Sequence, residues 1–174
     1  MKRNNRLAIA IILILGAVFA AAFIMNMSQS EKRRELLESS KIVLRWENGE
    51  ETLSLEDIRL AGEETFMGTL DTSSSDPSEH QYMGVQLSSI LMIYLEADYS
   101  EWEKVVVSGA DGFSVAYGRD EVQQSGNLYL AYMEDGEYLG DMDSGGRGPY
   151  ETIILSDMFS NRRCKWVVEI EVQK

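Results

Sequence analysis

The longest uncharged stretch of the sequence lies near its start and runs from Leu7 to Met25. At about 1.5 Å per residue, a helix of this length spans roughly the 30 Å hydrocarbon core of a bilayer. The segment is therefore predicted to be a membrane helix or a signal peptide. Small residues at 20–22 could serve a signal peptidase. The run is nevertheless longer than the usual signal-peptide core of about 7 to 15 residues, which favours an uncleaved anchor.

The charges on either side of this run predict its orientation. Lys2, Arg3 and Arg6 precede it, which favours a cytoplasmic N-terminus, although basic residues at 32–34 weaken that bias. The predicted organisation is a cytoplasmic end at 1–6, a transmembrane or signal segment at 7–25, a polar helical stalk at 26–40 and an extracytoplasmic domain at 41–174. We expect a single-pass protein of the cell membrane, or a secreted protein if the segment is cleaved.

Composition limits what the domain can contain and bind. A chain of 174 residues with 44% hydrophobic residues suffices for one domain with a sizeable core. The formal charge is −13 for the whole chain and −16 without the three basic residues ahead of the apolar run. Such an acidic domain repels nucleic acid and anionic lipid, so neither is expected as a partner. The single cysteine excludes an intrachain disulfide and any cysteine-cluster metal site.

The stretch from Lys104 to Tyr150 carries the clearest strand and turn signals. Its apolar and alternating runs are interrupted by the pairs Asp111-Gly112 and Asp135-Gly136, which are typical of turns between antiparallel strands. Four glycines between Leu139 and Pro149 then predict an irregular loop.

The flanking segments predict further strands and two helices. Residues 41–46 and 51–53 are expected to pair across an Asn48-Gly49 turn, and Ser54 is expected to begin a short helix with Asp57 in a capping box. Apolar residues at helical spacing predict a second helix within 85–97, and alternation near the C-terminus predicts a strand with one buried face. That face comprises Cys164, Trp166, Val168, Ile170 and Val172. An inert buried thiol is therefore favoured over a reactive one.

The polar segment 71–81 follows a short predicted strand at 65–70 and is expected to be a long loop. It contains His80, the only histidine of the chain. An exposed loop side chain and a chemical role are the two alternatives, and a metal site is disfavoured because no second histidine exists. Together these segments predict an α+β fold.

An ordered series of motifs resembles the oxidoreductase molybdopterin-binding domain of the sulfite oxidase type. The series covers roughly residues 41–173 and comprises Tyr82-x-Gly84-Val85-x-Leu87, Val105-Val106-Val107-x-Gly109-x-Asp111-Gly112-Phe113, Leu130-Ala131-Tyr132, Asp135-Gly136, Leu139, Gly148-Pro149 and Arg162-Arg163-x-Lys165-Trp166-Val167. The resemblance implies a mixed α+β fold around a coiled sheet, with molybdopterin as the cofactor. It points to Tyr82, Asp111, Tyr132, Arg162, Arg163 and Lys165 as cofactor-binding candidates.

Two departures from the family pattern bear on the chemistry. Catalytic members bind molybdenum through a cysteine thiolate in an early loop, whereas residues 65–81 contain no cysteine. Where the family usually has an arginine after the late glycine and proline, this chain has Glu151, an acid that would oppose an anionic cofactor. We therefore expect no metal ligand and assign no catalytic residue.

Three functions remain open on this basis. The first is a binding or accessory module that holds a small-molecule ligand or a partner envelope protein. The second is a small molybdopterin oxidoreductase, or a subunit of one, with unconventional ligation of the metal. The third is a calcium loop, since Asp141, Asp143 and Gly145 approach an EF-hand spacing, although Pro149 and Thr152 depart from that pattern.

Overall fold

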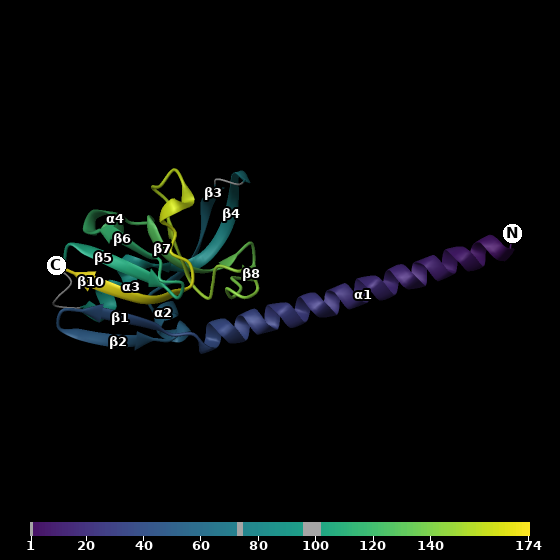
Figure 1. Ribbon diagram of the computed structural model, residues 1–174, viewed down its shortest axis with the longest axis horizontal. Helices are drawn as coiled ribbons and strands as arrows, with labels where there is room; N and C mark the ends of the chain where they lie inside the picture. The colour runs from purple at the N-terminus through teal and green to yellow at the C-terminus, as the bar shows by residue number, and fades with distance from the viewer. Residues whose placement is uncertain (1, 73–74, 96–101) are drawn as a thin grey trace.

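The structure, a computed structural model, describes residues 2–72, 75–95 and 102–174. Helix α1 (Lys2–Ser39) is continuous through the predicted membrane segment and stalk, and it projects away from the rest of the molecule (Figure 1). It is the one helix in the described ranges that is long and apolar enough to cross a bilayer. Its side chains from Ile11 to Met27 are exposed, as a lipid-facing segment would be. Leu37, near its end, is buried in the domain core.

The first sheet has the strand order β2-β1-β10-β5-β6 (Figure 1). Its strands are β1 (Ile42–Trp46), β2 (Gly49–Leu53), β5 (Lys104–Gly109), β6 (Ser114–Gly118) and β10 (Val167–Gln173). β1 and β10 are parallel and the other neighbours are antiparallel. The predicted turn at Asp111-Gly112 is thereby confirmed, and the predicted β1–β2 turn lies one residue earlier, at Glu47 and Asn48, with Gly49 already in β2.

The second sheet has the strand order β3-β4-β7-β8, and β9 pairs with β7. Its strands are β3 (Glu63–Thr72), β4 (Ser75–Gln86), β7 (Leu128–Glu134), β8 (Glu137–Tyr138) and β9 (Glu151–Ile154). The turn at Asp135-Gly136 is confirmed, because both residues have positive φ and connect β7 to β8. The glycine-rich segment between β8 and β9 is irregular, as predicted.

The described residues of the domain include four short helical segments: α2 (Leu55–Leu60), α3 (Leu87–Leu95), α4 (Arg119–Gln123) and the 3-10 turn η2 (Ser160–Arg162). The predicted capping box is present at the start of α2, where the Asp57 amide donates to Ser54 Oγ and the Ser54 amide donates to Asp57 Oδ2. The predicted second helix is confirmed as α3, while Glu96 and Ala97 at the end of that prediction lie outside the described residues.

Two apolar clusters stabilise this arrangement. The main core joins the inner faces of both sheets with α2 and α3 and includes Leu44, Val107, Leu130 and Ile170. A smaller cluster lies on the opposite face of the second sheet and comprises Phe66, Tyr82, Tyr129, Ala131 and Ile153. The mixed α+β class is therefore confirmed, and the second sheet has two covered faces.

Two expectations from the sequence are wrong in detail. The segment 71–81 is not a long loop, because β3 and β4 pair from Glu63 with Val85 to Thr72 with Ser75. Only Ser73 and Ser74 lie outside the described residues of that segment. Near the C-terminus the register shifts between Val167 and Glu169, so Val167 is buried and Val168 is exposed. Cys164 is buried as predicted, but it precedes β10.

Candidate functional site

A β-bulge on β7 creates the most unusual polar arrangement of the molecule. Met83 pairs with Met133 and Gly84 pairs with Ala131, so Tyr132 has no opposite residue on β4. A bulge of this kind reverses the side-chain alternation beyond it. Tyr132 lies on the main-core face with Leu130, as the regular alternation requires, whereas the bulge turns Glu134 to the other face of the sheet, beside Tyr82.

Tyr82 is fully buried and is held by charged groups on both sides of its hydroxyl. The hydroxyl donates to Glu134 Oε1 at 2.7 Å and accepts from Arg163 Nη1 at 3.1 Å. The Arg163 guanidinium also lies 5.3 Å from the ring centroid of Tyr82 and donates to the main-chain oxygen of Thr69 at 2.6 Å. Burial raises the pKa of Tyr82 to about 12, with Arg163 opposing the shift. The tyrosine is therefore neutral at ordinary pH.

Arg147 extends this arrangement from the glycine-rich loop. Its Nη2 lies 2.6 Å from Glu134 Oε2, and its Nε donates to Glu151 Oε2 at 2.9 Å. Glu151 is fully buried on β9, opposite Ala131. Tyr82, Glu134, Arg147, Glu151 and Arg163 form one cluster, which we call the buried ion network. Its two arginines and two glutamates balance in formal charge.

The surroundings of the network raise the pKa values of both Glu151 and Arg147. Burial raises the pKa of the Glu151 carboxyl, and the charges of Arg147 and Arg163 counteract that rise. Burial alone would lower the pKa of the Arg147 guanidinium, but Glu151 and Glu134 outweigh it and raise that pKa. One oxygen of Glu151, Oε1, is buried and has no hydrogen-bond partner among the described residues. The network is therefore satisfied in charge but not fully satisfied in hydrogen bonds.

His80 lies at the edge of the network on β4. Its Nδ1 is 2.6 Å from Asp135 Oδ2 and 3.6 Å from Glu134 Oε1, and its Nε2 is 2.8 Å from Ser78 Oγ. The side chain is 24% exposed and lies on β4, so the alternative of an exposed loop side chain is wrong. The hydrogen bond from His80, followed by one from the Gln81 amide, lowers the pKa of the Asp135 carboxyl.

A cavity of about 190 Å³ opens beside the network. Glu134 and Arg147 line it together with Glu137, Tyr138, Arg33 of α1 and the backbone of Leu139, Gly140, Gly145 and Gly146. Arg147 and Glu134 are 20% and 21% exposed there, so each presents a charge to solvent while paired with the other. The accessible part of the site can accept a small polar ligand that offers both donors and acceptors.

Four of the six predicted cofactor-binding residues lie elsewhere. Tyr132 is on the main-core face, where its hydroxyl donates to Glu63 and accepts from Arg59 Nε at 3.5 Å. Asp111 caps its own turn by accepting from the Phe113 amide at 3.0 Å. Lys165 is exposed, 5.9 Å from the Trp166 ring centroid.

Arg162 is the fourth of these residues, and it is held by two carboxylates. Its Nε and Nη2 donate to Asp157, the Nε bond measuring 2.8 Å, and Nη2 also donates to Glu121 Oε1 at 2.7 Å. Asp157 and Glu121 raise the pKa of the guanidinium. The structure thus brings together only Tyr82 and Arg163 of the six candidates.

The Cys164 thiol lies in the main core, and the hydrogen-bond acceptors described for it are main-chain oxygens. Its Sγ lies 3.7 Å from the oxygen of Phe113 and 3.8 Å from that of Lys165, and the residue has no exposed surface. Burial, followed by the charges of Asp111 and Glu151, raises the pKa of the thiol to about 12. The thiol is therefore protonated at ordinary pH and inaccessible.

The glycine-rich loop does not present an EF-hand arrangement. Asp141 Oδ1 accepts from the Ser144 amide at 2.7 Å, which closes a local turn. Among the described residues, no group of three or more His, Cys, Asp or Glu side chains is placed to hold a metal ion.

Sequence reasoning missed three members of the network: Glu134, Arg147 and Glu151. Glu151 was noted only as an acid where the resemblance has an arginine, and Arg147 lies within the segment predicted only as an irregular loop. The available signal was the uninterrupted β-branched and apolar context of Glu151-Thr152-Ile153-Ile154, in which a charged residue requires a buried partner.

The fold has a counterpart among solved proteins. A crystal structure of the sulfane dehydrogenase SoxCD from Paracoccus pantotrophus matches it with a TM-score of 0.62 and 15% sequence identity. The match covers 79% of this chain and 39% of that chain. No family model matches the sequence, and no curated protein matches it. At this identity the likeness establishes a distant relation of fold alone.

Proposed function

We propose that this protein is a membrane-anchored extracytoplasmic binding module that has the sulfite-oxidase-type fold without cysteine-ligated molybdenum. The observation that carries the proposal is the buried ion network. Glu151 stands where the resemblance has an arginine, and it neutralises Arg147 from inside the fold. Charges that would serve an anionic cofactor are used instead to hold β9 and the glycine-rich loop against the sheet.

The residues present do not fit a molybdopterin. Its phosphate needs cations that are not already engaged, yet Arg162 is held by Asp157 and Glu121, and Arg147 by Glu134 and Glu151. Arg163 donates to Tyr82 and to the main-chain oxygen of Thr69, which leaves the exposed Lys165 as the remaining candidate cation. Its molybdenum needs a thiolate, yet the only thiol is the buried Cys164. The cavity of about 190 Å³ beside Arg147 and Glu134 is the proposed ligand site, and a small polar molecule or a side chain of a partner protein suits it.

Metal and pterin analysis of the full chain tests this function. The protein is purified from the membranes of its own host, with an exported molybdopterin enzyme from that host as the loading control. We expect no molybdenum and no pterin in the chain while the control is loaded. Molybdenum and pterin near one per chain would overturn the proposal.

The competing function is a molybdopterin oxidoreductase, and the likeness to a dehydrogenase favours it. It predicts that Arg163→Ala and Lys165→Ala lower the cofactor content of the purified protein. A cofactor content that is the same in both variants as in the wild type, or that is zero in all three, would count against this function.

A further inference from the structure

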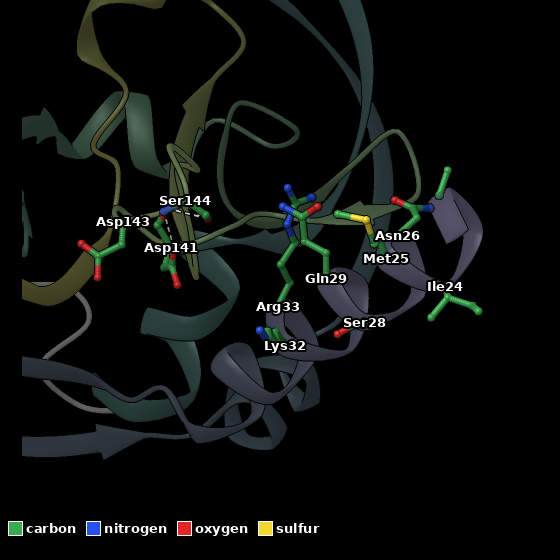
Figure 2. Close-up of a pocket in the computed structure, with 11 residues that line it drawn as sticks. Ile24, Met25, Asn26, Ser28, Gln29, Lys32, Arg33, Asp141, Asp143 and Ser144 are labelled. Atoms are coloured by element: carbon green, nitrogen blue, oxygen red, sulfur yellow. Dashed lines mark hydrogen bonds between the residues drawn. The ribbon is translucent and has the colours of Figure 1, made fainter. Parts of the chain in front are cut away.

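A second and larger hollow lies between α1 and the glycine-rich loop. Its volume is about 990 Å³, and Arg33 lines both this hollow and the network cavity. Figure 2 shows Gln29, Lys32 and Arg33 on α1, with Asp141, Asp143 and Ser144 on the loop. We call it the interfacial hollow, and its lining is Ala22, Ile24, Met25, Asn26, Ser28, Gln29, Lys32, Arg33, Asp141, Asp143 and Ser144.

The lining changes from apolar to charged along the helix. Ala22, Ile24 and Met25 form one end, and Lys32 and Arg33 form the other. At about 1.5 Å per residue, Arg33 is roughly 12 Å further along the helix axis than Met25. The interfacial layer of one leaflet is about 5–8 Å thick. If the apolar run ends at the hydrocarbon boundary, the hollow therefore extends from the acyl chains past the headgroup layer, and the long side chains of Lys32 and Arg33 can reach back to that layer.

The charges at the polar end are separated by sign. Lys32 and Arg33 are on the helix, and Asp141 and Asp143 are on the loop, so the lining is neutral in total but bipolar. The position of Arg33 is fixed because its Nη1 donates to the main-chain oxygen of Tyr138 at 3.3 Å. A phosphate beside the two cations and an ammonium beside the two carboxylates would complement this arrangement.

The composition of the lining narrows the headgroup class. None of its described residues is aromatic, so it offers no cage of the kind that holds a quaternary ammonium. Carboxylates accept hydrogen bonds, which suits a primary ammonium with three donors. A net charge of −13 on the chain disfavours an anionic lipid.

We propose that the interfacial hollow binds a zwitterionic phospholipid whose headgroup carries a phosphate and a primary ammonium. Lys32 and Arg33 contact the phosphate, Asp141 and Asp143 contact the ammonium, and the apolar end contacts the start of an acyl chain. This inference rests on the membrane anchoring in the proposed function. Bound lipid would fix the domain against the bilayer surface.

The test uses the full chain in nanodiscs of phosphatidylcholine that contain a fluorescent phosphatidylethanolamine at low abundance. Energy transfer from the protein's tryptophans to the probe reports enrichment at the chain. We expect the probe to be enriched around the wild type and Lys32→Gln to reduce its affinity roughly fivefold. The double variant Asp141→Asn with Asp143→Asn is expected to abolish the preference over phosphatidylcholine.

Matched controls are Lys41→Gln and Asp76→Asn, which change exposed charges outside the hollow and should leave enrichment unchanged. Equal enrichment of phosphatidylcholine, or stronger enrichment of phosphatidylglycerol, would overturn the inference. Complete displacement by soluble phosphoethanolamine would also overturn it, because that result assigns the hollow to a soluble phosphomonoester.

The mass of the mature protein separates this inference from the proposed function. Cleavage near residues 20–22 would remove the anchor and refute both. An intact N-terminus without lipid preference would refute the headgroup site alone, and bound molybdenum would refute the binding-module proposal alone.

Discussion

Replacing Arg147 by methionine leaves the Glu151 carboxylate buried without its nearest cation. Glu151 has no exposed surface, and its only hydrogen bond among those described is the 2.9 Å contact from Arg147 Nε. Removing one partner of a buried ion pair costs about 3–5 kcal/mol, because the remaining charge is desolvated and unpaired. We expect Arg147→Met to lower the free energy of unfolding by that amount.

The measurement is urea unfolding of the full chain in detergent micelles, followed by tryptophan fluorescence. With a dependence on urea of about 1–3 kcal/mol per M, the midpoint should fall by roughly 2 M. Replacing both partners, in Arg147→Met with Glu151→Met, should recover most of the loss, since apolar substitutes for a buried pair are often tolerated. Arg45→Met is the control, because Arg45 pairs with Glu50 and Glu169 at the exposed surface and its loss should leave the midpoint almost unchanged.

The pH dependence provides an independent check. Burial raises the pKa of the Glu151 carboxyl, so the folded state binds that proton more tightly than the unfolded state. The contribution of Glu151 to stability is therefore most favourable at low pH and declines as pH rises through its folded pKa. Loss of Arg147 raises this pKa further, so the deficit of Arg147→Met should shrink on acidification. A deficit no larger than that of Arg45→Met, or one that grows on acidification, would refute the reasoning.

Three further outcomes are expected. Gly84→Ala places a Cβ 2.5 Å from the oxygen of Leu130 and 2.8 Å from the Cα of Ala131, both of which are backbone atoms. It should destabilise the fold by about 1–3 kcal/mol in the same urea assay. An unchanged midpoint would show that the bulge relaxes freely. Ser54→Ala removes the capping box of α2 and should cost about 1 kcal/mol, whereas an increase in stability would contradict the cap. Cys164, with its pKa raised to about 12, should react with a maleimide dye only after unfolding, and rapid labelling of the native chain would show that the thiol is accessible.

Local patterns predicted most of the secondary structure because the signals were local. The Asp-Gly and Asn-Gly pairs, the capping residues of α2 and the helical spacing in α3 each depend on a few neighbouring residues. The hairpin of β3 and β4 was missed because segment 71–81 is polar on both faces and carries a proline. The pairing of this segment depends on β3, a partner that no local pattern within the segment reveals. Half of the segment's length also extends beyond the core.

The site could not be predicted for a related reason. Tyr82 and Tyr132 appear equivalent in the sequence, as aromatic residues within strand patterns, yet they occupy opposite faces of one sheet. Each tyrosine follows the ordinary alternation of its own strand, and the bulge at Tyr132 then places Glu134 rather than Met133 opposite Tyr82. A single unpaired residue thus decides which side chains can meet, and the alternation of β7 alone gives no sign of it.

The residues that carry the family resemblance have structural reasons to be present that do not involve a cofactor. Gly84 lies against the backbone of β7, and a Cβ at Gly109 would lie 2.4 Å from the oxygen of Lys165. Asp111 caps the turn that follows Gly109. These positions are fixed by close backbone approaches that any chain with this fold must accommodate. The resemblance therefore supports the shared fold independently of the chemistry, and the chemistry depends on the side chains that depart from it: the absent early cysteine and the buried Glu151.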